Sequence, residues 1–325
     1  MISLTAPTAN ELYAQACHAV LTQGRDVRPR GMPTTEILGA HLCLTSPRHR
    51  FVDLPPARVI NPAFAVAETL WILSGSDDPW IFDYNRNLAQ YADDGRLQGA
   101  YGPRMRRWRD GPDQLDNVRQ LLTRDPDSRQ AVIQLFDPER DTRGHRDVPC
   151  TLGYRFFIRD GRLHMHTTMR SQDLWLGFPY DVFAATVLQE LLATWLDVEL
   201  GEYHHFVDSL HLYEQHTTAA ATIDPSSTPP SEPLEPLAVP WTDFTTLLDD
   251  VISGQDPTTA PTRTWSAFAT VMTGYRSWTA GDRPLALATA ATTPGPLGAA
   301  LERWYERLAL QDPAAVTTVT SEATR

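Results

Sequence analysis

The sequence predicts an α/β fold in which strands and helices share one core. The alternating run from Tyr154 to Ile158 is typical of a strand, and the Asp160-Gly161 pair after it is typical of a hairpin turn. The run from Leu163 to Thr167 predicts the returning strand. From Tyr180 to Trp195 apolar residues recur with the period of a mostly buried helix, which we expect Gly201 to end. A chain of 325 residues with 42% hydrophobic residues is large enough for such a core.

Composition limits the partners that the protein can bind. The net charge of −12 argues against a general nucleic-acid or membrane surface, so a phosphate would need a local group of arginines. The three cysteines, Cys17, Cys43 and Cys150, have no paired spacing, which disfavours a disulfide framework and a zinc site. The N-terminus has no signal-peptide pattern and no run has membrane-spanning length, so we expect a soluble, cytoplasmic protein.

The first half of the chain predicts a succession of helices, strands and turns. Asn61 and Pro62 suit the start of a helix, as its N-cap and its first residue. The expected elements are a helix over 10–21 that ends before Gly24, a polar loop over 25–33, a strand over 36–44, helices over 63–73, 80–91 and 113–123, turns over 92–95 and 125–128, and a buried strand over 130–136.

After His216 the character of the sequence changes. Residues 223–240 are rich in proline and serine and predict a linker or an extended loop. Short helices are expected over 244–252, 264–275, 285–292 and 297–310. Residues 311–325 are polar, with the composition of a disordered tail.

Four short motifs bring reactive side chains to the ends of adjacent elements. They include a thiol, a guanidinium, a hydroxyl and carboxyl groups, which together indicate an active site. The motifs are Pro149-Cys150-Thr151, Arg170-Ser171-Gln172-Asp173, Leu176-Gly177-Phe178-Pro179-Tyr180-Asp181 and His211-Leu212-Tyr213-Glu214-Gln215-His216. Each motif alone is weak, whereas four in a fixed order form a specific signal.

In this order and spacing the motifs resemble the thymidylate synthase superfamily, the folate-dependent pyrimidine nucleotide methylases and hydroxymethylases. The resemblance extends upstream through 125–129, Ala100-Tyr101-Gly102 and Ala67-Glu68-Thr69-Leu70-Trp71 to about Leu12, and it fades after His216. Within this group, we expect the chain to stand with the CMP and dCMP 5-hydroxymethylases.

The resemblance also implies an architecture. We expect a mixed β-sheet that is flanked by helices and forms the interface of a homodimer with shared active sites. The catalytic domain would span residues 1–220, and residues 221–325 would form a divergent helical extension packed on it, with a polar tail. The implied partners are a pyrimidine nucleoside monophosphate and 5,10-methylenetetrahydrofolate, with no metal.

Cys150 is the expected nucleophile. Addition of its thiolate to C6 of a pyrimidine would make C5 enamine-like, so that C5 can attack a one-carbon electrophile. Arg170 would favour the thiolate. Without the motif, a buried structural cysteine would be the more common explanation. Glu68 lies in an apolar helix, where exposure on one face is the default, but the resemblance favours a catalytic role for it.

Arginines are expected to hold the 5′-phosphate, because guanidinium presents a planar fork to phosphate oxygens. The resemblance places Arg170 and Ser171 at this phosphate, together with Arg129 from the partner subunit. The family usually has two adjacent arginines at the latter position, whereas this chain has Arg129-Gln130. An arginine of the N-terminal loop is also implied, and the register leaves Arg28 and Arg30 as alternatives.

The sugar and the folate have their own expected ligands. His211 and Tyr213 stand two apart on a strand-like segment, so they point to one face and can bond the sugar hydroxyls. The residues implied at the folate are Asp173, as an acceptor for the pterin, and Leu176, Gly177 and Leu88, which would line its surface.

Asp181 is the position expected to choose the base. The methylating members carry asparagine there, which matches N3–H and O4 of uracil. Cytosine presents the inverse pattern, and a carboxyl group fits it. A mismatch would leave a buried polar group unpaired, at a cost of about 1–3 kcal/mol. By itself, Asp181 could simply cap a helix.

Three departures from the methylating pattern favour water over hydride as the final reactant. Thr151 replaces a histidine after the nucleophile, Leu88 stands in place of a tryptophan, and the end 322–325 lacks an apolar closure. Water would then be admitted, giving a hydroxymethyl product. Glu68, with Asp181 and Tyr101, would orient this water and move protons.

The expected activity is therefore 5-hydroxymethylation of CMP or dCMP. The first alternative is a dUMP C5-methylase, and the second is a non-catalytic nucleotide-binding homologue. The sequence does not decide whether the sugar of the substrate is ribose or deoxyribose. It also does not decide whether the enzyme serves a nucleoside-antibiotic pathway or phage-type DNA modification.

Overall fold

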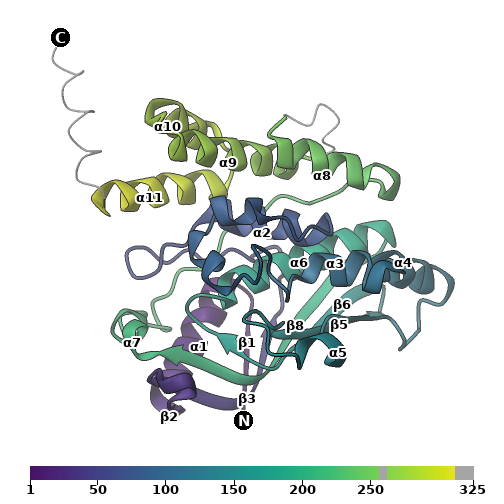
Figure 1. Cartoon of the computed structure of the whole chain (residues 1–325), viewed down its shortest axis with the longest axis horizontal. Helices are drawn as coiled ribbons and strands as arrows, with labels where there is room; N and C mark the ends of the chain where they lie inside the picture. The colour runs from purple at the N-terminus through teal and green to yellow at the C-terminus, as the bar shows by residue number, and fades with distance from the viewer. Residues whose placement is uncertain (256–261, 312–325) are drawn as a thin grey trace.

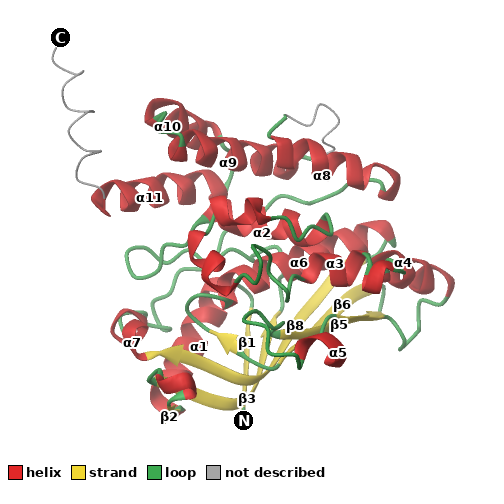
Figure 2. Cartoon of the chain, in the orientation of Figure 1, coloured by secondary structure: helices red, strands yellow, loops and turns green. Residues whose placement is uncertain are grey.

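A mixed sheet forms the base of the molecule, and helices cover one of its faces (Figure 1). The computed structural model describes residues 1–255 and 262–311. Helices α2 and α6 lie above the sheet, and helices α8 to α11 form a further layer over α2 (Figures 1 and 2). None of the described helices is long and apolar enough to span a membrane.

The sheet has eight strands. Its main path runs in the order β1-β3-β8-β6-β5-β4, with β2 paired to β3 and β7 paired to β8. The pairs β1–β3, β6–β8 and β7–β8 are parallel and the others are antiparallel, which confirms the expected mixed sheet. The strands are β1 Ile2–Ala6, β2 Arg25–Val27, β3 Thr34–Leu44, β4 Val132–Gln134, β5 Thr151–Arg159, β6 Arg162–Met169, β7 Gln172–Asp173 and β8 Glu199–Tyr213.

The predicted hairpin is present between β5 and β6. Asp160 and Gly161 join the two strands with positive φ angles of 51° and 71°, as a turn that follows the twist of antiparallel strands requires. Glycine adopts such angles without strain, and aspartate is among the few other residues that tolerate them.

The helices begin where their capping residues predict. The Asn61 side chain accepts hydrogen bonds from the amides of Ala63 and Phe64 at the start of α2, and Asp113 caps α4 in the same way. The α-helices are α1 Ala9–Gln23, α2 Pro62–Leu73, α3 Tyr101–Arg106, α4 Gln114–Arg124, α5 Pro138–Asp141, α6 Phe178–Trp195, α7 Glu214–Ala220, α8 Phe244–Ser253, α9 Arg263–Thr279, α10 Arg283–Thr292 and α11 Pro296–Gln311.

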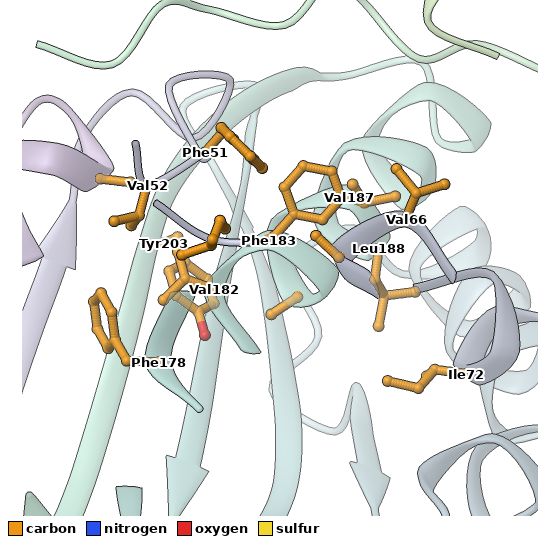
Figure 3. Packing of buried hydrophobic residues seen from close by; sticks show 14 of the residues in the cluster. Phe51, Val52, Val66, Ile72, Phe178, Val182, Phe183, Val187, Leu188 and Tyr203 are labelled. Atoms are coloured by element: carbon orange, nitrogen blue, oxygen red, sulfur yellow. The ribbon is translucent and has the colours of Figure 1, made fainter. Parts of the chain in front are cut away.

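Helix α6 is the centre of the core, because it packs on β6 and β8 on one side and on α2 on the other. Figure 3 shows Phe178 and Val182 of α6 near Tyr203 of the sheet, and all three are fully buried. Phe183 lies between Phe51 and Phe268 of α9, at ring-centroid distances of 6.0 and 6.1 Å. Each such phenylalanine contributes about 1.5–3 kcal/mol by leaving water.

The C-terminal helices are attached to the rest of the chain through an extended segment. The four helices expected after residue 240 are present, and α8, α9 and α11 contact α2. The amide of Leu234 donates to the Arg48 carbonyl at 3.0 Å, and Trp195 Nε1 donates to the Val239 carbonyl at 3.0 Å. The division into a domain over 1–220 and an extension remains a prediction, and residues 312–325 of the expected tail lie outside the described range.

Two expectations about helices are wrong. Residues 80–91 form two 3-10 helices, η2 Pro79–Asp83 and η3 Arg86–Tyr91, because the Asn85 side chain accepts from the Asn87 amide and interrupts the turn between them. Helix α6 ends at Trp195, and Gly201 belongs to β8 instead. A side chain at Gly201 would meet the Leu163 carbonyl oxygen of β6 at 2.9 Å, so glycine permits this strand pairing.

Two expectations about strands need smaller corrections. The polar loop over 25–33 contains β2, which pairs with β3, and a 3-10 turn over Pro29–Gly31. The buried strand expected over 130–136 is reduced to β4, an edge strand whose alternate side chains are exposed. An edge strand has a partner on one side only, so the apolar run did not indicate full burial.

Candidate active site

The candidate site lies where β5 begins and β6 ends. Because these strands are antiparallel, Thr151 pairs with Met169, and the residues just outside the pair, Cys150 and Arg170, meet. The Arg170 amide donates to the Cys150 carbonyl at 2.9 Å. The Arg170 guanidinium donates to the carbonyl oxygens of Pro149 at 2.9 Å and Val148 at 2.8 Å. Ser171 follows at the same corner.

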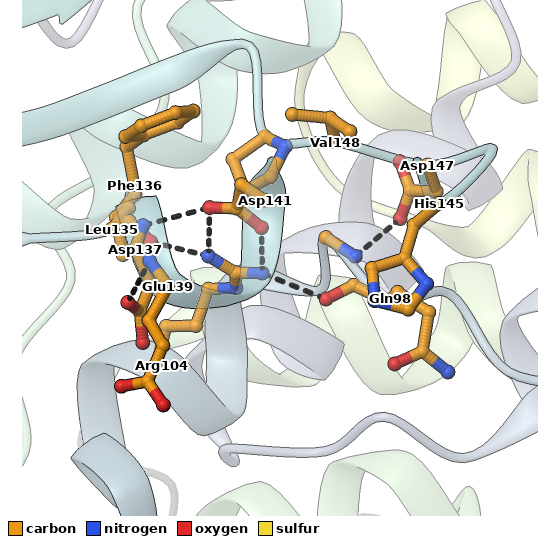
Figure 4. A network of polar contacts seen from close by, with 12 residues as sticks. Gln98, Arg104, Leu135, Phe136, Asp137, Glu139, Asp141, His145, Asp147 and Val148 are labelled. Carbon is orange, nitrogen blue, oxygen red and sulfur yellow. Dashed lines mark hydrogen bonds and ion pairs between the residues drawn. The ribbon is translucent and has the colours of Figure 1, made fainter. Parts of the chain in front are cut away.

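A buried ion pair fixes the loops around this corner (Figure 4). Arg104 of α3 donates to both carboxylate oxygens of Asp141 at 2.7 and 2.6 Å, and also to the carbonyls of Leu135 and Gln98. Removing one partner of such a pair leaves an uncompensated buried charge and costs about 3–5 kcal/mol. Beside it, the Gly99 amide donates to Asp147 Oδ2 at 2.8 Å. The segment carrying Tyr101 is thus fixed against the segment leading to Cys150.

Tyr101 reaches from α3 to the start of β5. The Thr151 amide donates to the Tyr101 hydroxyl at 3.2 Å. Burial raises the Tyr101 pKa well above its ordinary value, and the neighbouring Asp181 and Cys150 raise it further. Tyr101 is therefore a neutral hydroxyl between the thiol and a carboxyl group, where it can donate a hydrogen bond.

Two carboxyl groups approach this point from different helices. Burial raises the pKa of Glu68, on α2, to about 8, and the nearby Asp181 adds to the rise. Burial also raises the pKa of Asp181, in the first turn of α6, to about 6, while a hydrogen bond from Gln172 opposes the rise. Glu68 is thus largely protonated at neutral pH and suited to moving protons.

The thiol of Cys150 is half-buried and protonated near neutral pH. Burial raises its pKa, the Arg170 guanidinium opposes this, and Asp181 and Asp147 raise it further. Arg170 is the nearby cation that favours the thiolate. The structure therefore places the Arg170 guanidinium near the Cys150 thiol, and the catalytic role of Cys150 remains a prediction.

Three of the four residues predicted at the folate, Asp173, Leu176 and Gly177, lie just before the start of α6, whereas Leu88 lies on η3. Asp173 Oδ1 accepts from the amides of Trp175 at 2.8 Å and Leu176 at 2.9 Å, so one oxygen is committed to the turn. The Leu176 side chain is 52% exposed, as a residue contacting a flat ligand would be. A side chain at Gly177 would meet Gln172 Nε2 at 2.7 Å, so a larger residue there would displace the Gln172 amide. Leu88 is half-buried in η3.

The predicted sugar ligands lie side by side on β8. The rings of His211 and Tyr213 are 5.2 Å apart, and the strand pairs His211 with Asp173 of β7. The Arg30 guanidinium lies close enough to Tyr213 to oppose the rise in its pKa that burial causes. Arg28 is exposed and makes no recorded contact with the described site residues, so Arg30 is the better placed of the two alternatives.

Arg129 is not brought to the site of its own chain. The Phe156 amide donates to the Ala131 carbonyl at 3.0 Å, and Arg159 donates to the Asp127 carbonyl at 3.3 Å. Arg129 therefore lies beside the far end of β5, about 20 Å from Thr151 at roughly 3.3 Å per residue. It is exposed there.

The structure adds residues that the motifs did not indicate. Tyr154, on the inner face of β5, lies near Asp181 and Glu68, both of which raise its pKa beyond the effect of burial. Gln172 and His205 form a hydrogen-bonded pair behind Asp181. The alternation of β8 was the available signal for His205, because it puts this residue on the buried face with Tyr203.

Within the described residues, one group has the spacing of metal ligands, and it lies elsewhere. Cys43, Glu202 and His204 each offer one ligand atom, all within 4.8 Å of one another. His204 alternates with the buried Tyr203 and His205, so this group faces away from α6 and shares no residue with the site.

Comparisons with known proteins agree with this geometry. The family model described as Thymidylate synthase matches residues 11–231. Deoxyuridylate hydroxymethyltransferase of Bacillus phage SP01 is 36% identical over 238 residues, which cover 69% of this chain and 62% of the phage protein. The protein of the same name from Delftia phage PhiW-14 is 34% identical over 219 residues, 62% of this chain and 59% of its own. This chain thus spans about three-fifths of the length of these two relatives. With both the family match and the arrangement around Cys150 in place, the chain belongs to the thymidylate synthase family.

Proposed function

We propose that this protein transfers a one-carbon unit from 5,10-methylenetetrahydrofolate to C5 of a cytidine monophosphate, CMP or dCMP, and that water completes the 5-hydroxymethyl product. The names of the relatives support hydroxymethyl transfer as the reaction class. The observation that carries the cytosine assignment is Asp181, a buried carboxyl group near Cys150 whose pKa is raised to about 6.

Cys150 starts the reaction by adding its sulfur to C6, with its proton passing to a nearby base. Arg170 stabilises the thiolate and also bonds the 5′-phosphate with Ser171 and Arg30. C5 then attacks the one-carbon unit of the folate and loses its proton, and the bond between this carbon and the folate nitrogen breaks, so that tetrahydrofolate departs and leaves an exocyclic methylene on C5. Glu68 and Tyr101, which both lie near Asp181, position the water that adds to the exocyclic carbon, and Cys150 leaves C6 as the ring regains its double bond.

The folate supplies the one-carbon unit at formaldehyde oxidation level, and the surface near Cys150 fits it. The exposed Leu176 offers an apolar contact beside Gly177, and Asp173 keeps one carboxylate oxygen free of the turn it caps. Leu88 in place of an aromatic residue, together with Thr151, favours admission of water over hydride transfer. The third departure, at 322–325, lies outside the described residues.

Base choice has a serious rival. The relatives are named for deoxyuridylate, which favours hydroxymethylation of a uracil nucleotide. A carboxyl group at position 181 favours cytosine when it donates to N3 and accepts from N4, because N3 of cytosine accepts and N4 donates, whereas uracil presents N3–H and O4. We give Asp181 the greater weight because it is the group whose hydrogen-bonding pattern reads the base.

We also propose a homodimer with shared sites. The face of the sheet away from α6 carries half-buried, mutually stacked rings, including His41, His204 and Phe206. Figure 2 shows the long helices on the other side. Pairing of this face with a second copy would cover these rings and carry the exposed Arg129 toward the phosphate of the partner's nucleotide.

One incubation tests the proposed activity. The purified chain is mixed with an equimolar set of CMP, dCMP, UMP and dUMP plus 5,10-methylenetetrahydrofolate, and the products are read by mass spectrometry. We expect a 5-hydroxymethylcytidine monophosphate and tritium release from C5 of labelled substrate. Cys150→Ser should abolish both, whereas Cys43→Ser, on the opposite face of the sheet, should not. Preferential turnover of dUMP would overturn the cytosine assignment, and a methylated product would overturn the role of water.

A further inference from the structure

A buried chain of hydrogen bonds stands behind Asp181. Gln172 Nε2 donates to Asp181 Oδ2 at 2.8 Å and to the Asp173 carbonyl at 3.2 Å. Gln172 Oε1 lies 2.8 Å from His205 Nε2, and His205 Nδ1 lies 2.8 Å from the Tyr203 hydroxyl. Gln172, His205 and Tyr203 are all buried, at 1%, 0% and 0% exposure.

The chemistry of these atoms fixes the direction of the hydrogen bonds that link Asp181, Gln172 and His205. A backbone carbonyl only accepts, so the side of Gln172 that faces Asp173 must be the amide nitrogen. The opposite side is the amide oxygen, which only accepts, so His205 must carry its proton on Nε2. Burial lowers the pKa of His205 to about 3, which keeps it neutral and leaves Nδ1 as an acceptor. The Tyr203 hydroxyl lies 2.8 Å from Nδ1 and 2.9 Å from Thr167 Oγ1.

This direction matters because a lone carboxyl group cannot tell the two bases apart. A neutral carboxylic acid offers one donor and one acceptor, and it can exchange them by moving its proton between the two oxygens. In one order it matches N3 and N4 of cytosine, and in the other it matches N3–H and O4 of uracil. Gln172 always donates to Oδ2, so Oδ2 stays an acceptor and any proton is held on Oδ1.

We propose that Gln172, oriented by His205, is a specificity-determining positioning residue, which fixes the order of donor and acceptor on Asp181 and so lets this carboxyl group choose between cytosine and uracil. The inference deepens the proposed function and rests on it for the identity of the preferred base. The close approach of Gly177 supports it, because a side chain there would lie 2.7 Å from Gln172 Nε2 and 3.1 Å from Asp181 Oδ2. A side chain at position 177 would therefore displace the Gln172–Asp181 pair.

The test replaces Gln172 without changing Asp181. Gln172→Met keeps the approximate volume and removes the donor, and His205→Leu leaves Gln172 in place but frees its amide to turn over. Gln189→Met is the matched control, because Gln189 is also a buried glutamine of this core, and its amide donates to carbonyls of Leu163 and Gly201 instead. For each variant, kcat/KM is measured separately with cytidylate and with uridylate. Both nucleotides carry the same sugar, either ribose or deoxyribose, whichever the wild type prefers.

We expect Gln172→Met and His205→Leu each to lower the ratio of kcat/KM between the two bases by about tenfold or more. A change of this size corresponds to one buried hydrogen bond that is lost or mispaired. Gln189→Met should lower yield or stability but leave the ratio unchanged, because loss of folded protein affects both substrates equally. An unchanged ratio in folded Gln172→Met protein would show that Gln172 does not set base choice. If the wild type prefers uridylate, the proposed function fails, yet a ratio that moves in the variants still supports the role of Gln172.

Discussion

The backbone amide of Arg170 donates to the carbonyl oxygen of Cys150 at 2.9 Å, so the cation and the nucleophile are joined through the pairing of two strands. The guanidinium is then fixed beside the thiol by its own hydrogen bonds to the carbonyls of Val148 and Pro149. The influence of Arg170 on the thiol is therefore built into the sheet and does not depend on a mobile side chain.

Replacement of Arg170 should make the thiol harder to ionise. Arg170 is the group that opposes the raised pKa of Cys150, so Arg170→Met should raise this pKa further. Below the pKa, each unit of rise slows alkylation by iodoacetamide about tenfold, since only the thiolate reacts. The rate is measured against pH in a Cys43→Ser background, with Arg155→Met as a control, because Arg155 bonds Thr168 on the outer face of β6. A pH profile that does not move upward would contradict the assignment.

Glu68→Gln should remove activity and change how stability depends on pH. The folded-state pKa of Glu68 is about 8, above the ordinary value near 4.3. Between these values the folded protein holds a proton that the unfolded chain has released, so the free energy of unfolding falls as pH rises, by at most about 1.4 kcal/mol per unit. Glutamine does not titrate and so lacks this pH dependence of the free energy of unfolding. The stability of Glu68→Gln relative to the wild type should therefore rise from pH 5 to pH 8 in urea titrations.

The same variant should lose at least about a hundredfold in kcat while it still binds nucleotide, because general acid–base catalysis supplies factors of that size. Glu306→Gln is the control, since Glu306 is exposed on α11 and its replacement should change neither property. Full activity in Glu68→Gln would rule out a proton-moving role.

Local patterns in the sequence predicted most of the fold, because caps, turns and periodicity act over a few residues. The Asp160-Gly161 turn and the Asn61 cap are such cases, and both are confirmed. The helix expected over 80–91 failed because one side chain, Asn85, competes for a backbone amide. The choice between Arg28 and Arg30 also depended on local geometry, since Arg30 adopts a left-handed φ of 53° that no pattern signals.

The polar chain behind Asp181 was beyond the reach of sequence motifs. Gln172 and His205 are 33 positions apart, and they meet only because β7 and β6 both pair with β8 in parallel. Such pairings depend on the register of strands that are distant in sequence. The motif around Arg170 nevertheless contained Gln172, so the sequence named the residue without indicating its partner.

Mixing two inactive variants should restore activity if the sites are shared. Arg129 lies beside the far end of β5 from Cys150, so in the proposed dimer its phosphate contact would be made in the partner's site. In a heterodimer of Arg129→Ala and Cys150→Ala chains, one site carries neither lesion, and partial activity should return after subunit exchange. Mass spectrometry of differently tagged chains measures the exchange itself. Demonstrated exchange without recovered activity would contradict the shared-site assembly.

Asp181→Asn is the most direct test of base choice, because Asp181 is the residue proposed to contact the base. The change is nearly isosteric, so packing against Gln172 and Gly177 should persist, while the side chain gains a fixed donor in place of a carboxylate oxygen. Asparagine matches N3–H and O4 of uracil, so kcat/KM for uridylate should rise relative to cytidylate by about tenfold or more for each buried group that changes partner. The product should still be hydroxymethylated, because Leu88 and Thr151 are unchanged.

The two substrates are assayed in competition across pH 5 to 8. In the wild type, cytidylate turnover should change near the Asp181 pKa of about 6, and this dependence should disappear in the variant. A variant that keeps both its base preference and its pH dependence would show that Asp181 does not read the base.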